Sequence, residues 1–227
     1  MNRKLITSSL IPSLLLTALV MTTSAKAEGV YIFGNVNSSS VEHSIERNLG
    51  SNPAAISGDS GGVSNVQDTA FAAGLGIGYK IDLNEDLYIA AEGFYEKNNN
   101  SSRNINGVLV TDINLESSYG VRLLAGVNVN KKFSVYAHGG YTELDFDIRN
   151  SYTFAPPVKT RSESKGAFAY GVGADYKVNG NYSLYAQYSQ IADIDFDGIP
   201  EVAGGTGRIN PNKLDLSQLT IGLRYAF

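Results

Sequence analysis

The last residues of the chain alternate strictly between large apolar side chains and small or polar ones. Gly222 and Arg224 belong to the small or polar set. Side chains of a β-strand point alternately to opposite faces, so the pattern predicts a strand that runs to the terminal residue. A chain end normally frays and gains little from a large apolar side chain, so something outside the strand must bury this face. The apolar face consists of Leu219, Ile221, Leu223, Tyr225 and Phe227.

The first residues have the three parts of a secretory signal peptide. Arg3 and Lys4 form a basic start, residues 5–20 are mostly apolar, and residues 25–27 read Ala-Lys-Ala. A membrane-spanning helix needs about 20 apolar residues, and this core is shorter and contains Pro12. We therefore expect cleavage after Ala27, which makes residues 1–27 the signal and residues 28–227 one exported domain.

The composition limits how that domain is stabilised and what it binds. Exported domains often rely on disulfides, but the chain has no cysteine. Its stability must then come from a continuous hydrogen-bonded architecture. With 22 acidic against 18 basic residues, nucleic acid is excluded as a partner.

Seven more segments show the two-residue alternation, joined in turn by short turns and long polar loops. We expect the long loops at residues 38–67, at 97–115, around Pro156-Pro157 and at 191–213, and Asn179-Gly180 is a strong hairpin signal. After Thr142 the alternation reverses its phase, which indicates either a bulge or a strand that continues past a membrane into water. The predicted strands are residues 29–37, 69–81, 87–96, 118–129, 133–142, 167–178 and 182–189.

Two architectures could use eight such strands: a soluble barrel or sandwich with the apolar face inside, or a membrane barrel with it outside. The second face decides between them, because it consists of Gly, Ala and Ser with sparse charge and would make a poor solvated surface. A narrow eight-stranded barrel has room inside for such side chains. We therefore predict an all-β, eight-stranded antiparallel up-and-down transmembrane β-barrel. Its aromatic girdle near the turns is Tyr79, Phe133, Tyr176, Tyr182, Tyr225 and Phe227.

The signal peptide, the eight strands and the ending LTIGLRYAF resemble small Gram-negative outer-membrane barrels of the OmpA/OmpX type. The resemblance covers nearly the whole exported chain. It implies an outer-membrane location among lipid and lipopolysaccharide, delivery by periplasmic chaperones, and recognition of the last strand by the barrel assembly machinery. It also implies a non-enzymatic envelope role, with outer loops that contact host surface molecules. A narrow channel and a lipid-modifying enzyme remain the alternatives.

Charged and polar residues on the inward faces predict a network that plugs the lumen. Glu92 and Arg122 lie on neighbouring strands and can pair, whereas an unpaired charge in a narrow barrel would cost several kcal/mol. We favour a structural plug over a conducting pore. The expected members are Lys80, Asp175, Lys177 and Arg224 near the periplasmic end and Glu92, Arg122, His138 and Gln187 near the middle.

One acidic segment resembles the beginning of a calcium loop. Asp193, Asp195, Asp197 and Gly198 match its first positions, but the twelfth, normally Glu, is Gly204. Glu201 could still contribute a ligand. A solvated acidic loop is the favoured interpretation.

The two histidines do not predict a catalytic triad. His43 lies in the expected first loop and His138 in the lumen, and neither has a serine and a carboxylate at a suitable spacing. The sequence also contains no cofactor motif, so we expect no enzyme activity.

Overall fold

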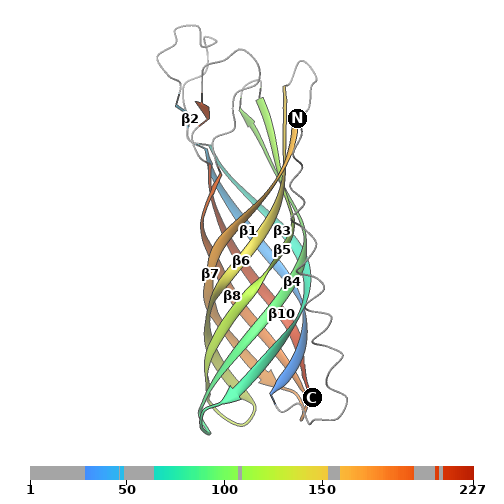
Figure 1. The fold of residues 1–227 in the computed structure, drawn as a ribbon, viewed down its shortest axis with the longest axis vertical. Helices are drawn as coiled ribbons and strands as arrows, with labels where there is room; N and C mark the ends of the chain where they lie inside the picture. The colour runs from blue at the N-terminus through green and yellow to red at the C-terminus, as the bar shows by residue number, and fades with distance from the viewer. Residues whose placement is uncertain are drawn as a thin grey trace, which may run out of the picture.

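Eight long antiparallel strands form a closed barrel (Figure 1). The computed structural model describes residues 29–45, 47–48, 64–106, 109–152, 159–196, 208–209 and 212–227. Among these residues there is no helix long and apolar enough to cross a membrane. The barrel strands are β1 (Val30–Ile45), β3 (Ser64–Asp82), β4 (Leu87–Asn106), β5 (Leu109–Asn128), β6 (Phe133–Tyr152), β7 (Lys159–Lys177), β8 (Tyr182–Phe196) and β10 (Asn212–Ala226).

Each strand pairs with its neighbours along the chain, and β1 pairs with β10 to close the barrel. The closing register runs from Tyr31 opposite Ala226 to Ser44 opposite Lys213. Closure removes the unpaired sheet edges that hydrocarbon does not tolerate. A separate two-stranded sheet joins β2 (Arg47–Asn48) to β9 (Arg208–Ile209). The predicted eight-stranded up-and-down architecture is confirmed.

The three short turns use the same local device. In each, an asparagine side-chain oxygen accepts backbone N–H bonds from the residues two and three positions later, at 2.8–3.1 Å. Asparagine favours turns for this reason. The three residues are Asn84, Asn130 and Asn179. The predicted Asn179-Gly180 turn is therefore present.

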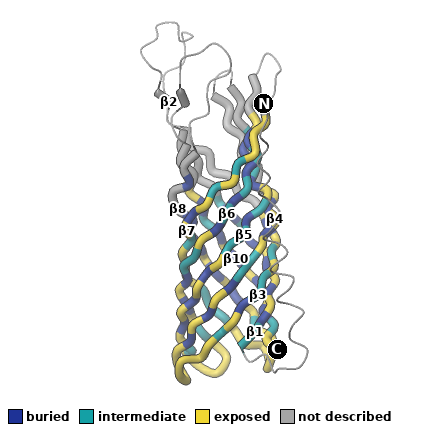
Figure 2. Tube along the Cα trace, viewed as in Figure 1, coloured by how far each residue is buried: buried dark blue, intermediate teal, exposed yellow. Residues whose placement is uncertain are grey.

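The outer wall near the turns carries a band of exposed apolar side chains. Leu75, Val121 and Leu123 are each about two-thirds exposed, and Figure 2 shows how exposed and buried positions alternate along the strands. An apolar surface of this extent would be unfavourable in water. The band is therefore the lipid-facing surface of the barrel.

Aromatic side chains mark both borders of the band. The lower girdle is the one predicted near the turns, and a second girdle lies eight residues further along several strands, as with Phe133 and Tyr141 on β6. At about 3.3 Å per residue and a tilt of about 40°, eight residues rise roughly 20 Å along the barrel axis, close to the usual apolar band. The upper girdle comprises Phe71, Tyr95, Tyr141, Phe168, Tyr170 and Tyr188.

The strands continue well beyond the upper girdle, so the predicted loop boundaries are wrong. Most of the stretch predicted as a loop at residues 97–115 belongs to β4 and β5, and His43 lies on β1 rather than in a loop. In the same way β6, β7, β8 and β10 extend into their predicted loops. In water both faces of a strand can be polar, so side-chain alternation no longer reveals the backbone pairing there.

The phase reversal in β6 comes from a change of environment, because the strand β6 itself contains no bulge. Thr142 and Leu144 are both buried, and Glu143 lies between them. Leu144, Phe146 and Ile148 continue the inward face, while Asp145 and Asp147 are only partly buried. The register shift lies on the neighbouring strand β5, between Leu115 and Ser117. Above the membrane the barrel is apolar inside and polar outside, as in a soluble protein.

The wall divides into two sheets at the end opposite the short turns (Figure 1). Among the described residues, β3 and β4 pair only below Ala72 and Asn98, and β7 and β8 only below Phe168 and Ala192. Above these points β3, β1, β10 and β8 remain together, and so do β4, β5, β6 and β7. Each sheet therefore has free strand edges outside the membrane.

Candidate functional site

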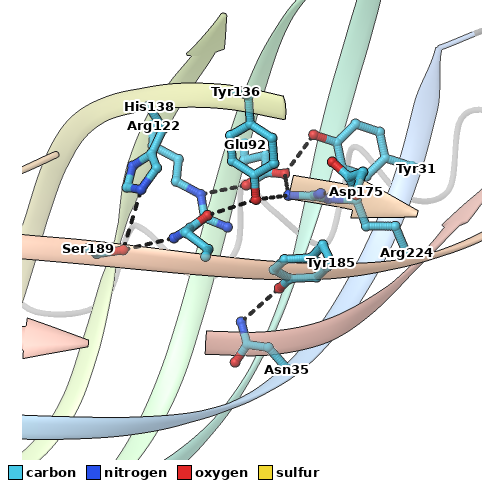
Figure 3. Close-up of polar contacts among 11 residues, drawn as sticks. Tyr31, Asn35, Glu92, Arg122, Tyr136, His138, Asp175, Tyr185, Ser189 and Arg224 are labelled. Carbon is cyan, nitrogen blue, oxygen red and sulfur yellow. Dashed lines mark hydrogen bonds and ion pairs between the residues drawn. The ribbon is translucent and has the colours of Figure 1, made fainter. Parts of the chain in front are cut away.

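The lower lumen holds a compact ion-pair network (Figure 3). Arg122 Nε lies 2.5 Å from Glu92 Oε2, and Arg224 Nη2 lies 2.9 Å from Glu92 Oε1. Arg224 Nη1 lies 2.5 Å from Asp175 Oδ1. Two carboxylates and two guanidinium groups thus balance one another in a space with almost no solvent contact. The residues come from β4, β5, β7 and β10, so the network connects strands around the barrel.

Aromatic side chains enclose the network. Tyr31 Oη donates a 2.7 Å hydrogen bond to Glu92 Oε1, and the guanidinium carbon of Arg224 lies 3.9 Å from the centre of the Tyr185 ring. Arg224 Nη2 also donates to Tyr136 Oη at 3.4 Å. These contacts combine charge-assisted hydrogen bonds with cation–π interactions.

Glycines on neighbouring strands make room for the inward aromatic rings. Five rings each lie over the glycine directly opposite in register, where they occupy the space that a Cβ would need. The small residues of the inward face are therefore partners of the large ones. The pairs are Tyr31–Gly78, Phe33–Gly76, Tyr88–Gly126, Tyr136–Gly173 and Tyr185–Gly222. On β1, Tyr31 and Phe33 point inward.

The middle lumen is polar. Gln187 accepts a hydrogen bond from Tyr136 Oη at 3.2 Å and donates one to Ser189 Oγ at 2.9 Å. Ser189 Oγ lies 3.4 Å from His138 Nε2. A small cavity of about 20 Å³, enough for one or two water molecules, lies among side chains that include Glu96, Arg122 and His138.

Among the described residues, the buried serine–histidine contact has no third member of a catalytic triad. A general base needs a group that orients its second ring nitrogen, and His138 Nδ1 has no hydrogen-bond partner within the described part of the chain. Both His138 and Ser189 are buried, so a substrate could not reach them without opening the barrel.

The upper lumen contains an apolar cluster that the sequence interpretation missed. Leu144 and Leu216 have no exposed surface, and Phe146 is only 2% exposed. The cluster lies above the polar layer and closes the lumen a second time. We call it the apolar plug: Ile113, Leu115, Leu144, Phe146, Ile148, Ala167, Ile191, Ile194 and Leu216. The phase reversal after Thr142 was the available signal for it.

Two predicted network members lie outside the network. Lys80 pairs with Asp82 at 3.1 Å, lies over the Tyr88 ring and is about one-third exposed. Lys177 is exposed at the end of β7. A long flexible lysine at the barrel mouth near the short turns keeps its ammonium group in water. Conversely, the buried Glu96 was not predicted as a member of the luminal network, although it lies on the same face of β4 as Glu92.

The acidic segment is only partly described. Asp193 and Asp195 belong to β8, where Asp195 is opposite Lys213 on β10. Asp197, Gly198, Glu201 and Gly204 lie outside the described residues. Across the described ranges, no group of three or more His, Cys, Asp or Glu side chains could hold a metal ion.

The closed barrel, the apolar band and the filled lumen define an integral membrane β-barrel. The chain belongs to the outer membrane protein beta-barrel domain family, whose model matches residues 11–227. A search of curated proteins finds no match.

A comparison with solved structures finds outer-membrane proteins. The outer membrane protein OprG from Pseudomonas aeruginosa has a TM-score of 0.52 at 14% identity, covering 89% of this chain and 98% of its own. The outer membrane protease OmpT from Escherichia coli has a TM-score of 0.49 at 10% identity, covering 91% and 99%. Ail, the attachment invasion locus protein of Yersinia pestis, has a TM-score of 0.40 at 14% identity, covering 87% and 99%.

The family places the barrel in the Gram-negative outer membrane. In such barrels the short turns face the periplasm and the longer connections face outward. The asparagine turns therefore lie on the periplasmic side, and the apolar plug lies at the extracellular end.

Proposed function

We propose that this protein is a non-enzymatic barrel that supports the envelope and presents its extracellular strands as a binding surface for molecules outside the cell. The observation that carries the proposal is the lumen, which is filled at two levels. The ion-pair network occupies the lower level and the apolar plug occupies the upper one. A filled lumen has no path for solutes, so the outer surface is the part available for a specific role.

The free strand edges above the upper girdle suit an extended polypeptide partner. On β7, residues 159–167 pair with β6 on one side and, among the described residues, with no strand on the other. Unpaired N–H and C=O groups of an edge strand can accept an added strand. A host surface protein with an extended segment is the partner class that this edge favours.

We also propose that the two ends of the chain direct export and assembly. Residues 1–27 would direct export and be removed, and periplasmic chaperones would deliver the unfolded domain. Leu219, Ile221, Leu223, Tyr225 and Phe227 would serve as the signal read by the barrel assembly machinery. Ile221 and Phe227 are more than half exposed on the outer wall, which supports this role because a recognition factor needs an accessible strand face.

Planar-bilayer recording of the purified barrel tests whether the lumen conducts ions. We expect no large, stable conductance steps, because both levels of the lumen are closed. Stable open-channel currents would overturn the proposal in favour of a narrow channel.

The surface role is tested by a truncation that preserves the register. Arg149 is opposite Thr160, so replacing residues 150–159 with Asn-Gly would shorten the β6–β7 hairpin without shifting it. Adhesion of expressing cells to host cells should fall, while heat-modifiable gel mobility stays unchanged. The matched control changes Lys131 in a periplasmic turn to Gln and should keep full adhesion. Unchanged adhesion with altered lipid A in mass spectrometry would instead favour a lipid-modifying activity.

A further inference from the structure

Four polar side chains gather inside the barrel on β1 and β4, on either side of β3. Asn35 and Glu96 are both register partners of Gly74, so they face each other across a residue without a side chain. A Cβ placed on Gly74 would lie 2.7 Å from Glu96 Cγ and 2.8 Å from Asn35 Oδ1, so both side chains lean over the glycine. The second pair flanks Ala72 in the same way. We call this group the Asn–Glu site: Asn35, Asn37, Glu96 and Asn98.

The Asn–Glu site contains buried oxygen atoms without donors. All four side chains are at most 8% exposed. The Oδ1 atoms of its three asparagines have no hydrogen-bond partner within the described ranges, and neither has the donor atom Asn37 Nδ2. Buried polar atoms in folded proteins are nearly always satisfied by protein groups, water or an ion. Three amide oxygens beside one carboxylate therefore form a site built for an electropositive ligand.

The carboxylate of Glu96 also lacks a counter-charge. Between the periplasmic mouth and the apolar plug, the buried carboxylates Glu92 and Glu96 and the partly buried carboxylate Asp175 face two guanidinium groups. Glu92 contacts both guanidinium groups and Asp175 contacts that of Arg224. Arg122 Nη2 has no hydrogen-bond partner among the described residues, but no described cation lies within 4.0 Å of Glu96, and three carboxylates still exceed two guanidinium groups by one negative charge. Ser118 Oγ and Gln218 Nε2 donate to Glu96 Oε2, but at long distances of 3.3 and 3.4 Å. Burial of an uncompensated carboxylate is strongly unfavourable.

The nearby histidine does not supply the missing charge. A protonated imidazole has two N–H donors, and each needs an acceptor when buried. His138 Nε2 contacts Ser189, but Nδ1 has no acceptor among the described residues. The ring is therefore neutral, and one negative charge remains unmatched at Glu96.

We propose that the Asn–Glu site binds one hard monovalent cation with the charge and oxygen preference of Na⁺. The Glu96 carboxylate would supply the charge, and the amide oxygens of Asn35, Asn37 and Asn98 would supply neutral ligands. Hard cations prefer oxygen ligands, and one positive charge balances the lumen. Protein sites for Ca²⁺ generally use several carboxylates, whereas this one has a single carboxylate. The cation would tie β1 to β4 across β3.

The first test compares heat-induced loss of the compact form of the purified full-length barrel in NaCl and in N-methylglucamine chloride of equal ionic strength. Binding to the folded state raises the unfolding midpoint by linkage. We expect the unfolding midpoint to rise by about 3 to 6 °C for each tenfold increase in the Na⁺ concentration above the dissociation constant of the site. Equal midpoints in the two salts would overturn the proposal. Stabilisation by CaCl₂ at matched ionic strength without an effect of NaCl would overturn its monovalent character.

Two variants locate the effect. Glu96→Gln keeps the shape but removes the charge, so its midpoint should not depend on Na⁺ and should be at least as high as that of the wild type in N-methylglucamine. Glu163→Gln is the matched control, because Glu163 already pairs with Arg161 near the extracellular mouth, and it should keep the full Na⁺ dependence. Retained dependence in Glu96→Gln would refute the assignment.

A crystallographic measurement gives an independent answer. Crystals of the barrel grown in NaCl should show a density peak bounded by the four side chains, and crystals grown in N-methylglucamine chloride should lack it. A peak elsewhere in the lumen would contradict the site. Infrared detection of a protonated carboxylic acid that disappears in Glu96→Gln would show that a proton, rather than a metal cation, removes the charge, and would also overturn the proposal.

Discussion

Arg224 is the best position at which to test the charge balance of the lower lumen. Its guanidinium group contacts Glu92 at 2.9 Å and Asp175 at 2.5 Å and stacks on the Tyr185 ring. Replacing Arg224 with Gln leaves two buried carboxylates with one guanidinium group. Removing one partner of a buried ion pair costs about 3–5 kcal/mol, so Arg224→Gln should lower the free energy of unfolding by that amount.

A second substitution, Asp175→Asn, should restore part of the free energy of unfolding that Arg224→Gln removes. Asp175→Asn together with Arg224→Gln leaves one carboxylate and one guanidinium group, which again balance at the 2.5 Å contact between Glu92 and Arg122. The double variant should be more stable than Arg224→Gln alone, with a coupling energy of about 1–3 kcal/mol. Lys80→Gln is the control, because Lys80 is a partly exposed cation at the mouth, and its ion pair should be worth less than about 1 kcal/mol.

The assay is equilibrium unfolding in urea, with the barrel refolded in detergent micelles or short-chain lipid vesicles. The chain has no Trp and 14 Tyr, so far-UV circular dichroism and cold gel mobility are better probes than tryptophan fluorescence. Asp175→Asn is also measured alone. If the losses of Arg224→Gln and Asp175→Asn simply add in the double variant, the two side chains do not share a balanced network. The same conclusion follows if Arg224→Gln is no less stable than Lys80→Gln.

Three further perturbations test other parts of the barrel. Gly173→Ala should destabilise it by about 1–3 kcal/mol, because a tyrosine ring fills the space of the new methyl group, whereas Gly93→Ala meets nothing within 4 Å and should be neutral in the same unfolding assay. Phe146→Ala should cost about 3–5 kcal/mol because Phe146 is buried in the apolar plug, while Asp147→Ala on the outer face should cost less than about 1 kcal/mol; equal losses would show that the plug contributes no packing. Deleting Phe227 should reduce the amount of folded protein in the outer-membrane fraction of cells far more than it lowers the unfolding midpoint of purified barrels, and the reverse result would refute its role in assembly.

Sequence reasoning succeeded wherever the membrane imposes a simple rule. Lipid must contact one apolar face on every strand, so the alternation in β3 or β10 predicted the strand, its facing and the barrel. The placement of Glu92 and Arg122 on the same side of adjacent strands came from the same rule. The structure places their side chains in contact.

Sequence reasoning failed where the solvent changes along one strand. Above the upper girdle, β6 keeps its inward face, but the face turns from polar to apolar at Leu144. Alternation alone cannot distinguish this inversion from a bulge, because both place apolar residues in the opposite phase. The same ambiguity hid the strand extensions of β4 and β5 and made them resemble loops.

The chain by itself therefore determined the number of membrane strands, their outward faces and the terminal strand Leu219 to Phe227, because these follow from period-two burial against lipid. Only the tertiary structure decided which inward residues meet. That outcome depends on the register between strands, which brings each large ring over a glycine, joins Arg224 to both Glu92 and Asp175, and leaves Glu96 beside three unsatisfied amide oxygens. Register is a relation between distant segments, and no local pattern in the sequence encodes it.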